Sequence, residues 1–321
     1  MEKQARHVPV LLKEALNFLD VRPGGVYVDC TLGLAGHAEG IARRLGPAGR
    51  LIGFDRDGEA LELARTKLAK VCEELGDQAP QVTLIGEAFS RIAEHVEPES
   101  ADGILADFGV SSLQLEEAQR GFSFQAENDG PLDMRMDQRA ELTAEQVVNR
   151  MSEHELADLV YKYGEERRRR TVARAIVRSR PIATTGQLAR IVASVLPPRK
   201  FGQIHPATRT FQALRIFVNK ELDEIEALLE AAPKLLKPSG RVVVISFHSL
   251  EDRIAKDSLR EGAHQGIWKI LTKKPVTADE EEMSKNPRSR SAKLRAGERT
   301  KSKGLETRDQ ANGAIQARRR W

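Results

Sequence analysis

The residues from Val26 to His37 read Val-Tyr-Val-Asp-Cys-Thr-Leu-Gly-Leu-Ala-Gly-His, and they combine residue types that could bind a nucleoside. An apolar run ends in an acid, a glycine-containing turn follows, and a helical pattern continues from Ala38 to Leu45. In a parallel sheet, this strand-loop-helix order brings backbone N–H groups to the carboxyl end of a strand, where nucleotide-like ligands bind. Asp55 closes a second predicted strand about 20 residues after Gly33, where a carboxylate can bind both ribose hydroxyls of an adenosine.

The spacing of the loop glycines indicates which kind of adenosine ligand fits. Gly33 and Gly36 form a Gly-x-x-Gly pattern rather than Gly-x-Gly-x-x-Gly, and His37 follows directly. A dinucleotide needs an open helix N-terminus for its pyrophosphate, so this more crowded loop favours a ligand without phosphate, such as S-adenosylmethionine. Taken singly, the two glycines are also typical of turns, and Asp55 is also typical of a strand end. Their combination in this element order favours the ligand.

A second acid lies in the segment 103–112, which reads Gly-Ile-Leu-Ala-Asp-Phe-Gly-Val-Ser-Ser. Asp107 and Phe108 follow an apolar predicted strand, so they should lie in the crevice where the cofactor and a second substrate meet. The exocyclic amine of cytosine is a poor nucleophile because its lone pair is delocalised into the ring. A carboxylate that accepts its N–H bonds and later its proton would favour methylation, and Phe108 could stack on the base. The alternative is that Asp107 caps the following helix.

Other polar patterns allow two interpretations each. The segments 120–124 and 129–137 are predicted loops, with acids and arginines alternating in the second as in a salt-bridged strand. The run 167–170 is either a solvated arginine face or a phosphate contact. A helix predicted over 206–231 carries a polar stripe without carboxylates, formed by Thr208, Gln212, Arg215 and Asn219. This stripe is either exposed to solvent or lines a cleft for RNA or cofactor.

The segment 246–253 reads Ser-Phe-His-Ser-Leu-Glu-Asp-Arg and follows another apolar strand. His248 is a candidate general base, or it orients the loop through its ring N–H. Ser249 is the predicted N-cap of the helix that follows.

Composition excludes several classes of protein. The chain has 321 residues, 40% hydrophobic and 31% charged, which is typical of a soluble globular protein. Its apolar runs are far shorter than the ~20 residues that span a bilayer, and no apolar signal segment follows the charged N-terminus. The two cysteines, Cys30 and Cys72, form no metal or disulfide pattern and are expected to fill buried space. We therefore expect a cytoplasmic protein with no membrane partner and no metal.

Charge is unevenly distributed along the chain. From Ser284 onward there are twelve Lys and Arg residues against three acids, a net +9, which leaves −5 for the rest of a chain whose total is +4. A basic end on a mildly acidic body predicts a polyanionic partner. The alternative for the segment 301–321 is a solvated, disordered tail.

The order of the predicted elements defines the fold class. Strands alternate with helices up to residue 112, no strand is predicted over 113–222, and strands resume at Gly240. This pattern predicts an α/β protein with a mostly parallel, doubly wound sheet, interrupted by an inserted all-helical domain over 113–222. The sheet domain would then comprise 1–112 and 223–300, with a late edge hairpin near 267–276 and 291–299, followed by the basic tail 301–321.

Together, these motifs resemble those of the bacterial ribosomal RNA small subunit methyltransferase H family, also called MraW. The resemblance covers about 295 residues and rests on the segments that begin with His7-Val-Pro-Val, Asp29-x-Thr-x-Gly, Asp107-Phe-Gly-Val-Ser-Ser, Arg120-Gly-Phe-Ser-Phe, Asp129-Gly-Pro-Leu-Asp, His205-Pro-Ala-Thr-Arg, Ser246-Phe-His-Ser and Arg290-Ser-Ala-Lys. It implies a class I, Rossmann-like methyltransferase that uses S-adenosylmethionine to methylate N4 of a decoding-centre cytosine in 16S ribosomal RNA, within the small subunit. Whether the protein is a monomer or a homodimer stays open.

The resemblance also implies the site residues. The cofactor contacts that it implies are Ala35, Gly36, His37, Asp55, Phe89, Asp107 and Gln114. For catalysis we expect direct transfer, with Asp107 accepting from the amine, Phe108 beside the base and His248 as a further candidate. One departure is visible: the family usually has Gly-Gly-His where this chain has Ala35-Gly36-His37, and alanine disfavours a positive φ. We expect that change to be tolerated.

Two other functions use the same features. A nicotinamide oxidoreductase could share the sheet, but the Gly-x-x-Gly spacing and the lack of a phosphate-cradling loop disfavour it. A non-catalytic RNA-binding module is disfavoured by the presence of both Asp55 and Asp107.

Overall fold

The computed structural model describes residues 9–198 and 204–301. The chain divides into two compact units, one formed by the residues before Val110 and from Glu224 onward, the other by Val110–Asp223. The second unit is therefore an insertion into the first, with junctions next to the predicted 113 and 222. The predicted tail lies outside the described residues after Lys301.

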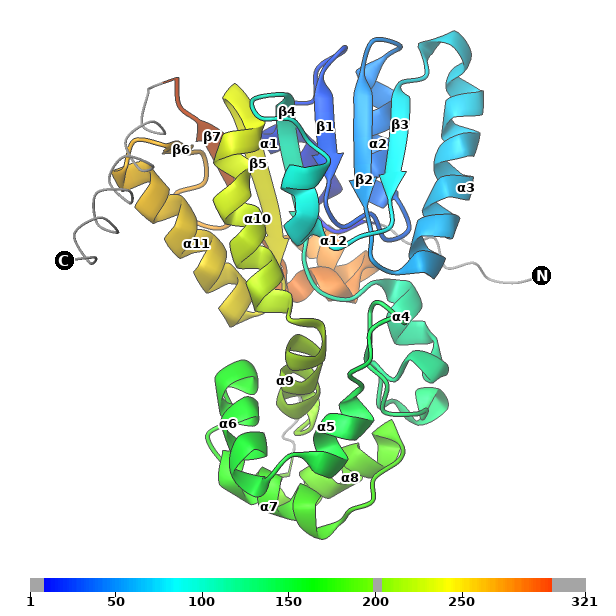
Figure 1. The fold of residues 1–321 in the computed structure, drawn as a ribbon, viewed down its shortest axis with the longest axis vertical. Coiled ribbons are helices and arrows are strands. Elements are labelled where there is room, and N and C mark those ends of the chain that lie inside the picture. Colours follow the sequence, from blue (N-terminus) through cyan, green and yellow to red (C-terminus); the bar gives the residue numbers. More distant parts are fainter. Residues whose placement is uncertain (1–8, 199–203, 302–321) are drawn as a thin grey trace, which may run out of the picture. The chain divides into compact units, whose positions relative to one another are not determined.

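The first unit is built on a seven-stranded sheet in the order β3-β2-β1-β4-β5-β7-β6 (Figure 1). All pairings are parallel except those of β7, which runs antiparallel to β5 and β6. The α/β class is thereby confirmed. The strands are β1 (Val26–Asp29), β2 (Arg50–Phe54), β3 (Gln81–Ile85), β4 (Ala101–Asp107), β5 (Leu236–Ser246), β6 (Trp268–Ile270) and β7 (Lys293–Arg299).

The late hairpin is present, but its first strand is shorter than the predicted 267–276. β6 ends at Ile270, and Val276 returns to β7 only as an isolated bridge to Leu294. Pro275 lies between them, and a proline has no N–H with which to continue a strand ladder.

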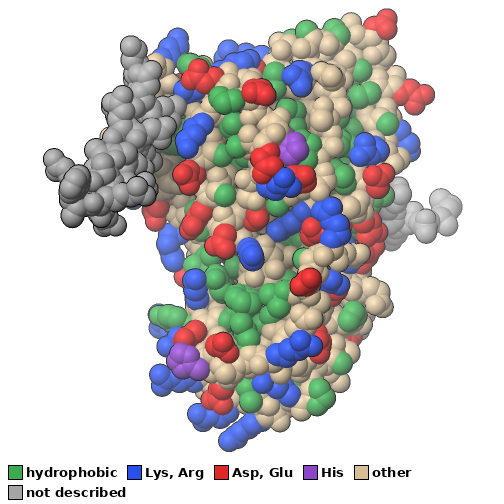
Figure 2. Space-filling view, viewed as in Figure 1, with side chains coloured by type: hydrophobic (Ala, Val, Ile, Leu, Met, Phe, Trp, Pro, Cys, Tyr) green, Lys and Arg blue, Asp and Glu red, His purple; other side chains and the backbone are tan. Residues whose placement is uncertain are grey.

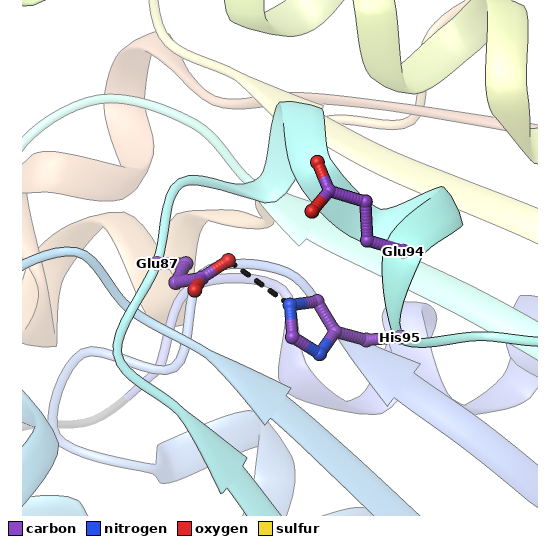
Figure 3. Close-up of side chains that lie close together, drawn as sticks. All are labelled: Glu87, Glu94 and His95. Carbon is purple, nitrogen blue, oxygen red and sulfur yellow. Dashed lines mark hydrogen bonds and ion pairs between the residues drawn. The ribbon is translucent and has the colours of Figure 1, made fainter.

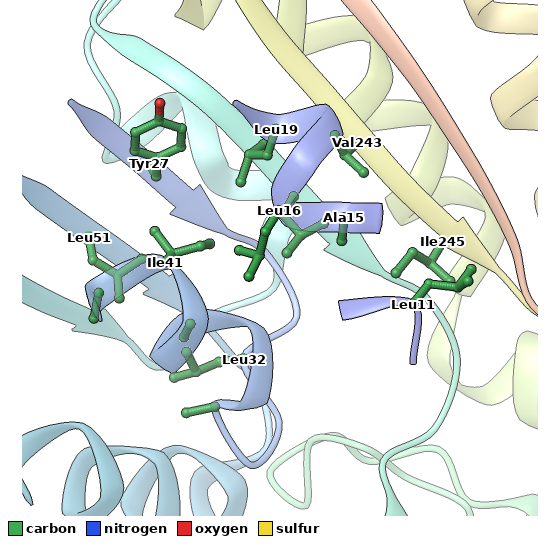
Figure 4. Packing of buried hydrophobic residues seen from close by; sticks show 14 of the residues in the cluster. Leu11, Ala15, Leu16, Leu19, Tyr27, Leu32, Ile41, Leu51, Val243 and Ile245 are labelled. Carbon is green, nitrogen blue, oxygen red and sulfur yellow. The ribbon is translucent and has the colours of Figure 1, made fainter. Parts of the chain in front are cut away.

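Helices cover both faces of this sheet. On one face lie α1 (Leu12–Leu19), α2 (Gly36–Leu45) and α3 (Gly58–Leu75), while α10 (Glu221–Leu235) and α11 (Ser249–His264) cover the other (Figure 1). Because side chains alternate along a strand, Val243 and Ile245 of β5 pack into the cluster formed with α1 and α2 (Figure 4), and Val242 and Val244 are buried on the opposite side. A parallel sheet buried on both faces explains the continuous apolar runs in the sequence.

The second unit is helical, and its core contains no residue of the sheet. Four of its helices begin with a capping box, in which a Ser or Thr and the Gln or Glu three residues later bond each other's backbone N–H. Its helices are α4 (Ser112–Glu116), α5 (Ala144–Arg150), α6 (Glu153–Gly164), α7 (Arg169–Arg178), α8 (Thr185–Val195) and α9 (Thr208–Asn219), with the 3-10 helices η3 (Ala118–Arg120) and η4 (Ala126–Asn128). The first unit also has α12 (Glu280–Lys285) and the 3-10 helices η1 (Gly76–Gln78), η2 (Phe89–Glu94) and η5 (Pro287–Ser291).

Two helix predictions were wrong in detail. The single helix predicted over 206–231 is broken between α9 and α10, because Lys220 adopts a left-handed conformation with φ 51° and ends α9. Where the alternation of strands and helices predicts a helix between β3 and β4, near 89–96, the chain forms the 3-10 helix η2, which Pro98 follows closely. Among the described residues, no helix is long and apolar enough to cross a membrane.

The polar stripe of α9 bonds within its own unit rather than facing a cleft. Gln212 donates to the Tyr163 carbonyl, and Arg215 forms two 2.8 Å contacts with Glu221. Asn219 is buried; its Nδ2 donates to the Met134 carbonyl and its Oδ1 accepts from Met136 N, both at 2.7 Å. For these three residues the cleft-lining interpretation is wrong, because their side chains bond to groups of their own unit: backbone groups for Gln212 and Asn219, and the Glu221 carboxylate for Arg215.

Replacing Asn219 tests how strongly this side chain holds the 134–136 loop. Asn219→Ala leaves a buried N–H and a buried carbonyl without their partner, so we expect the free energy of unfolding to fall by about 2–4 kcal/mol. Urea denaturation measures the change. The control is Leu142→Ala in the same unit, where the side chain is 38% exposed and the expected change is within about 0.5 kcal/mol. Equal effects of the two changes would contradict the assignment.

Candidate active site

Three aspartates end neighbouring strands at the carboxyl edge of the sheet. Asp29 closes β1, Asp107 closes β4, and Asp55 directly follows β2. β1 lies between β2 and β4, and its Asp29 is in register with Gly53 of β2 and Leu105 of β4. Parallel strands that start in register also end together, which is why acids distant in sequence converge here. Asp29 was not among the predicted site residues, although its position at the end of the first strand is the signal that could have identified it.

Hydrogen bonds from the loop after β1 connect these strand ends. Asp55 Oδ2 accepts from Gly33 N at 2.8 Å, and Thr31 Oγ1 accepts from Asp107 N at 2.6 Å. Thr31 N donates in turn to Asp29 Oδ1 at 3.1 Å. The loop thus connects the carboxyl ends of β1, β2 and β4 through hydrogen bonds. Thr31, like Asp29, was not among the predicted site residues.

The loop has the backbone conformation that the Gly-Gly-His pattern implies. Gly33 has φ 48° and Ala35 has φ 54°, so Ala35 does adopt the left-handed region that glycine favours. Its methyl group is fully buried in the core cluster. Gly36 begins α2, and a Cβ there would lie 2.9 Å from the Pro9 ring, which requires glycine at this position.

Burial changes the acidity of the three aspartates. It raises the pKa of Asp29 to about 7, that of Asp55 to about 6 and that of Asp107 to about 8. Backbone N–H donors oppose the shift at Asp29 and Asp55, and the positive charge of Arg288 opposes it at Asp107. Two carboxylate oxygens, Asp29 Oδ2 and Asp107 Oδ1, are buried without a hydrogen-bond partner in the described part of the chain. Such atoms suit a ligand that brings a positive charge or hydrogen-bond donors.

Two other predicted residues lie beside these carboxylates. His37, in the first turn of α2, is buried, and its Nδ1 lies 3.8 Å from Asp107 Oδ2. The Phe89 and Phe108 rings are 6.2 Å apart between centroids, so η2 and the end of β4 form one aromatic wall. Phe108 is only 3% exposed, so the ring offers little free surface on which a base could stack in this structure. Phe89 is the more accessible of the two rings.

His248 has a structural role that argues against general-base chemistry. It, and not the predicted Ser249, is the N-cap of α11, and its Nδ1 accepts from Glu251 N at 3.3 Å. The neutral ring then carries its proton on Nε2, which lies 3.1 Å from Glu251 Oε1. Nδ1 is therefore used by the helix cap, while Nε2 is buried against Glu251 and has no hydrogen-bond partner among the described residues. The Ser249 prediction was wrong because an imidazole nitrogen can accept the capping bond as a hydroxyl does.

Gln114 belongs to the second unit. Its side chain is buried in the capping box of α4, where Oε1 accepts from Ser111 N and the Gln114 backbone N–H donates to Ser111 Oγ.

The same unit contains a cavity of about 320 Å³ lined by Phe124, Asp129, Gly186, Ala189, Arg190, Ala193 and His205. Asp129 Oδ1 accepts from Gly186 N at 2.8 Å, which caps α8 from the predicted 129–137 loop. In that loop the predicted salt-bridged strand is absent, and Asp133 pairs locally with Arg135.

The basic residues are used in two ways. Arg295 and Arg299 are buried; Arg295 contacts Asp252 at 2.6 Å and Arg299 pairs with Glu99. Part of the basic excess near the C-terminus is therefore neutralised inside the sheet unit. The run 167–170 differs, because Arg167, Arg168 and Arg170 are exposed. Figure 2 shows Lys and Arg side chains gathered over α6 and α7.

Among the described residues, one group could in principle share a metal ion. Glu87, Glu94 and His95 lie close together, and His95 Nε2 is 3.0 Å from Glu87 Oε2 (Figure 3). Arg91 pairs with both glutamates. The arrangement is an ordinary exposed ion-pair cluster, and we assign it no metal.

The strand order and the carboxyl-edge acids define the class of this protein, a Rossmann-like S-adenosylmethionine-dependent methyltransferase. The family model of the MraW methylase family matches residues 4–300, and the chain belongs to that family. Two relatives are each called ribosomal RNA small subunit methyltransferase H. The protein of Acidobacterium capsulatum is 64% identical over 93% of this chain and 100% of its own length, and that of Koribacter versatilis is 58% identical over 92% and 95%. Among solved structures, an rRNA methylase from Streptococcus thermophilus is similar with a TM-score of 0.41 and 12% identity, covering 92% of this chain and 99% of its own.

The residues at the strand ends fit the cofactor of this class. Each oxygen of Asp55 accepts one backbone N–H, from Gly33 and from Asp57, and keeps a second lone pair that a ribose hydroxyl could use. The unpartnered oxygens of Asp29 and Asp107 suit a ligand that carries a positive charge.

The raised pKa values predict how stability depends on pH. In the unfolded chain these carboxyl groups titrate near pH 4, so between about pH 4 and pH 8 the folded state binds more protons. Stability should therefore fall as the pH rises through that range. Without cofactor, we expect the free energy of unfolding in urea to be lower at pH 8.5 than at pH 6 by on the order of 2 kcal/mol. Asp107→Asn should reduce the difference; greater stability at pH 8.5 would show that the aspartates are not buried as described.

The effect of Ala35 can be tested by restoring glycine. Ala35→Gly relieves a left-handed alanine, worth about 1 kcal/mol, and removes one buried methyl, which costs about 0.8 kcal/mol. Because the two effects oppose each other, we expect the unfolding free energy to change by less than about 1 kcal/mol and the affinity for S-adenosylmethionine by less than about threefold. Denaturation and calorimetric titration measure the two quantities. A tenfold gain in affinity would show that the alanine strains the cofactor loop.

Proposed function

We propose that this protein transfers a methyl group from S-adenosylmethionine directly to the N4 exocyclic amine of a cytosine in the decoding centre of 16S ribosomal RNA. The observation that carries this proposal is the Asp107 carboxylate, which closes β4 beside the cofactor loop and keeps one buried oxygen unpartnered. The names of the relatives support ribosomal RNA of the small subunit as the substrate.

The proposed cofactor contacts follow the residues that the structure brings together. Asp55 would hold the ribose hydroxyls, and Phe89 would lie beside the adenine. The loop residues Ala35 and Gly36, with His37, would line the remaining part of the ligand. Gln114, from the second unit, is the contact that rests on the resemblance alone.

The chemistry required of the protein is limited. When bound, S-adenosylmethionine supplies a methyl carbon made electrophilic by its sulfonium. Asp107 accepts an N–H bond from the amine, which withdraws the nitrogen lone pair from the ring and orients it for attack. Phe108 is buried against Phe89 rather than open to the base, which is a revision of its expected stacking role. His248 leaves the proposed catalytic set because its Nδ1 caps α11 and its Nε2 is buried against Glu251.

The RNA partner agrees with the charges on the helical unit. The exposed arginines Arg167, Arg168 and Arg170 at the start of α7 are suited to phosphate contacts. Nearby, the Arg169 guanidinium lies 4.5 Å from the ring centre of Tyr161, which is 53% exposed. An exposed aromatic ring beside arginines is typical of surfaces that bind single-stranded RNA, and the target base must leave its stack to reach Asp107.

Asp107→Asn tests the proposed reaction. The amide cannot accept the amine proton as a base, so we expect methylation of isolated small ribosomal subunits to fall by about 100-fold or more. Binding of S-adenosylmethionine should weaken by about tenfold at most, since Asp55 remains. Transfer from radiolabelled cofactor measures the first quantity and calorimetry the second.

The control is Asp279→Asn, at the exposed N-cap of α12, where asparagine caps equally well and activity should not change. Mapping the product by mass spectrometry identifies the nucleotide. A methyl group on a ring carbon or a ribose, or full activity of Asp107→Asn, would overturn the proposal.

A further inference from the structure

His37 and Asp107 face each other across the cofactor loop. His37 Nε2 lies 3.0 Å from the Val10 carbonyl oxygen. Because a carbonyl can only accept, Nε2 carries the hydrogen, and in the neutral ring Nδ1 is then the basic nitrogen. That nitrogen is the one that lies 3.8 Å from Asp107 Oδ2. The Val10 carbonyl thus sets the tautomer that presents a base to the carboxyl group.

The surroundings of Asp107 favour the protonated form of its carboxyl group. Burial is the main cause that raises its pKa to about 8, and the negative charges of Asp29 on β1 and Glu251 on α11 act in the same direction. Arg288 on η5 opposes them. Without ligand, the carboxyl group is thus mostly protonated at neutral pH, and an imidazole nitrogen lies close to it.

We propose that His37 and Asp107 act as one proton-sharing pair, which takes up the proton that the amine loses during methyl transfer. This inference rests on the proposed function for the origin of that proton. Asp107 touches the substrate amine and is the catalytic member. His37 acts through Asp107 and is a positioning residue, held by Val10.

The atoms of the step balance as follows. The amine nitrogen donates its lone pair to the methyl carbon, and the electrons of the broken carbon–sulfur bond stay on the sulfur, which becomes a neutral thioether. The nitrogen is then cationic and gives one proton to the Asp107 carboxylate. The resulting carboxyl group shares that proton with His37 Nδ1 until it passes to water. No oxidant or further reactant is required.

The pair must be without this proton before transfer begins. A cationic ligand beside Asp107 favours the carboxylate, so binding of S-adenosylmethionine should expel the shared proton. S-adenosylhomocysteine has the same amino and carboxyl groups but no sulfonium, so it should expel less. The difference between the two ligands therefore reports the protonation of the pair without any need for RNA.

Calorimetric titrations at pH 7 in two buffers of different ionisation enthalpy measure this difference. We expect S-adenosylmethionine to release roughly half a proton or more beyond S-adenosylhomocysteine in the wild-type protein. The difference should vanish in Asp107→Asn, shrink in His37→Gln and persist in the control Asp279→Asn. Equal proton release for the two ligands in the wild-type protein would overturn the proposal.

A pH profile of single-turnover methyl transfer tests the role of His37. His37→Gln places an amide nitrogen where Nε2 was and can keep the Val10 bond, but it removes the basic nitrogen facing Asp107. Without that acceptor the carboxyl group loses its proton more readily. The rising limb of the profile should move to lower pH by about one unit, and the plateau rate should fall by about tenfold.

His37→Asn is the second variant, in case glutamine impairs folding. It places an amide near the Nδ1 position and should shift the profile less, in the same direction. Unchanged inflections in both variants would exclude a shared proton, even if the rates fell. If the product proves not to be N4-methylcytosine, the proposed function fails, while the calorimetric difference still decides whether the pair exists.

Discussion

The hydrogen bonds from the loop after β1 to its neighbouring strands hold the site together. Thr31 Oγ1 accepts from the backbone of Asp107, and Asp55 accepts from the backbone of Gly33, so one short loop connects the ends of three parallel strands. The left-handed conformations of Gly33 and Ala35 give the loop the shape that these bonds require. The positions of the acids and the start of α2 depend on this arrangement, because each lies within a few residues of one of these bonds.

Placing several carboxyl groups at one buried edge costs stability and provides chemistry. Asp29, Asp55 and Asp107 all have raised pKa values, so keeping them ionised costs free energy in the protein without its ligand. In the proposed site, a cationic cofactor bound beside these acids would offset this cost, and the same burial would favour the positively charged methyl donor over its neutral product.

The inserted unit shows the limit of inferring function from polar side chains. Gln212, Arg215 and Asn219 looked suited to a ligand, yet each is bonded to a group of its own unit. These bonds satisfy buried backbone and carboxylate groups where the 134–136 loop and the start of α10 meet α9. Three arginines at and before the start of α7 are exposed, as both a solvated face and the proposed RNA phosphate contact require.

The fold class, the family and the placement of the strand-end acids follow from the residue pattern alone. Apolar runs of strand length that alternate with helical patterns predict a parallel sheet, and parallel strands bring their last residues to one edge, so Asp55 and Asp107 could be placed in advance. The groups that surround these acids are known only from the folded chain. The His37–Asp107 contact, the Val10 carbonyl behind it and the charge of Arg288 join segments that no local periodicity relates. The helix cap made by His248 and the break at Lys220 were also undecided, because they depend on single hydrogen bonds and on long-range packing rather than on residue pattern.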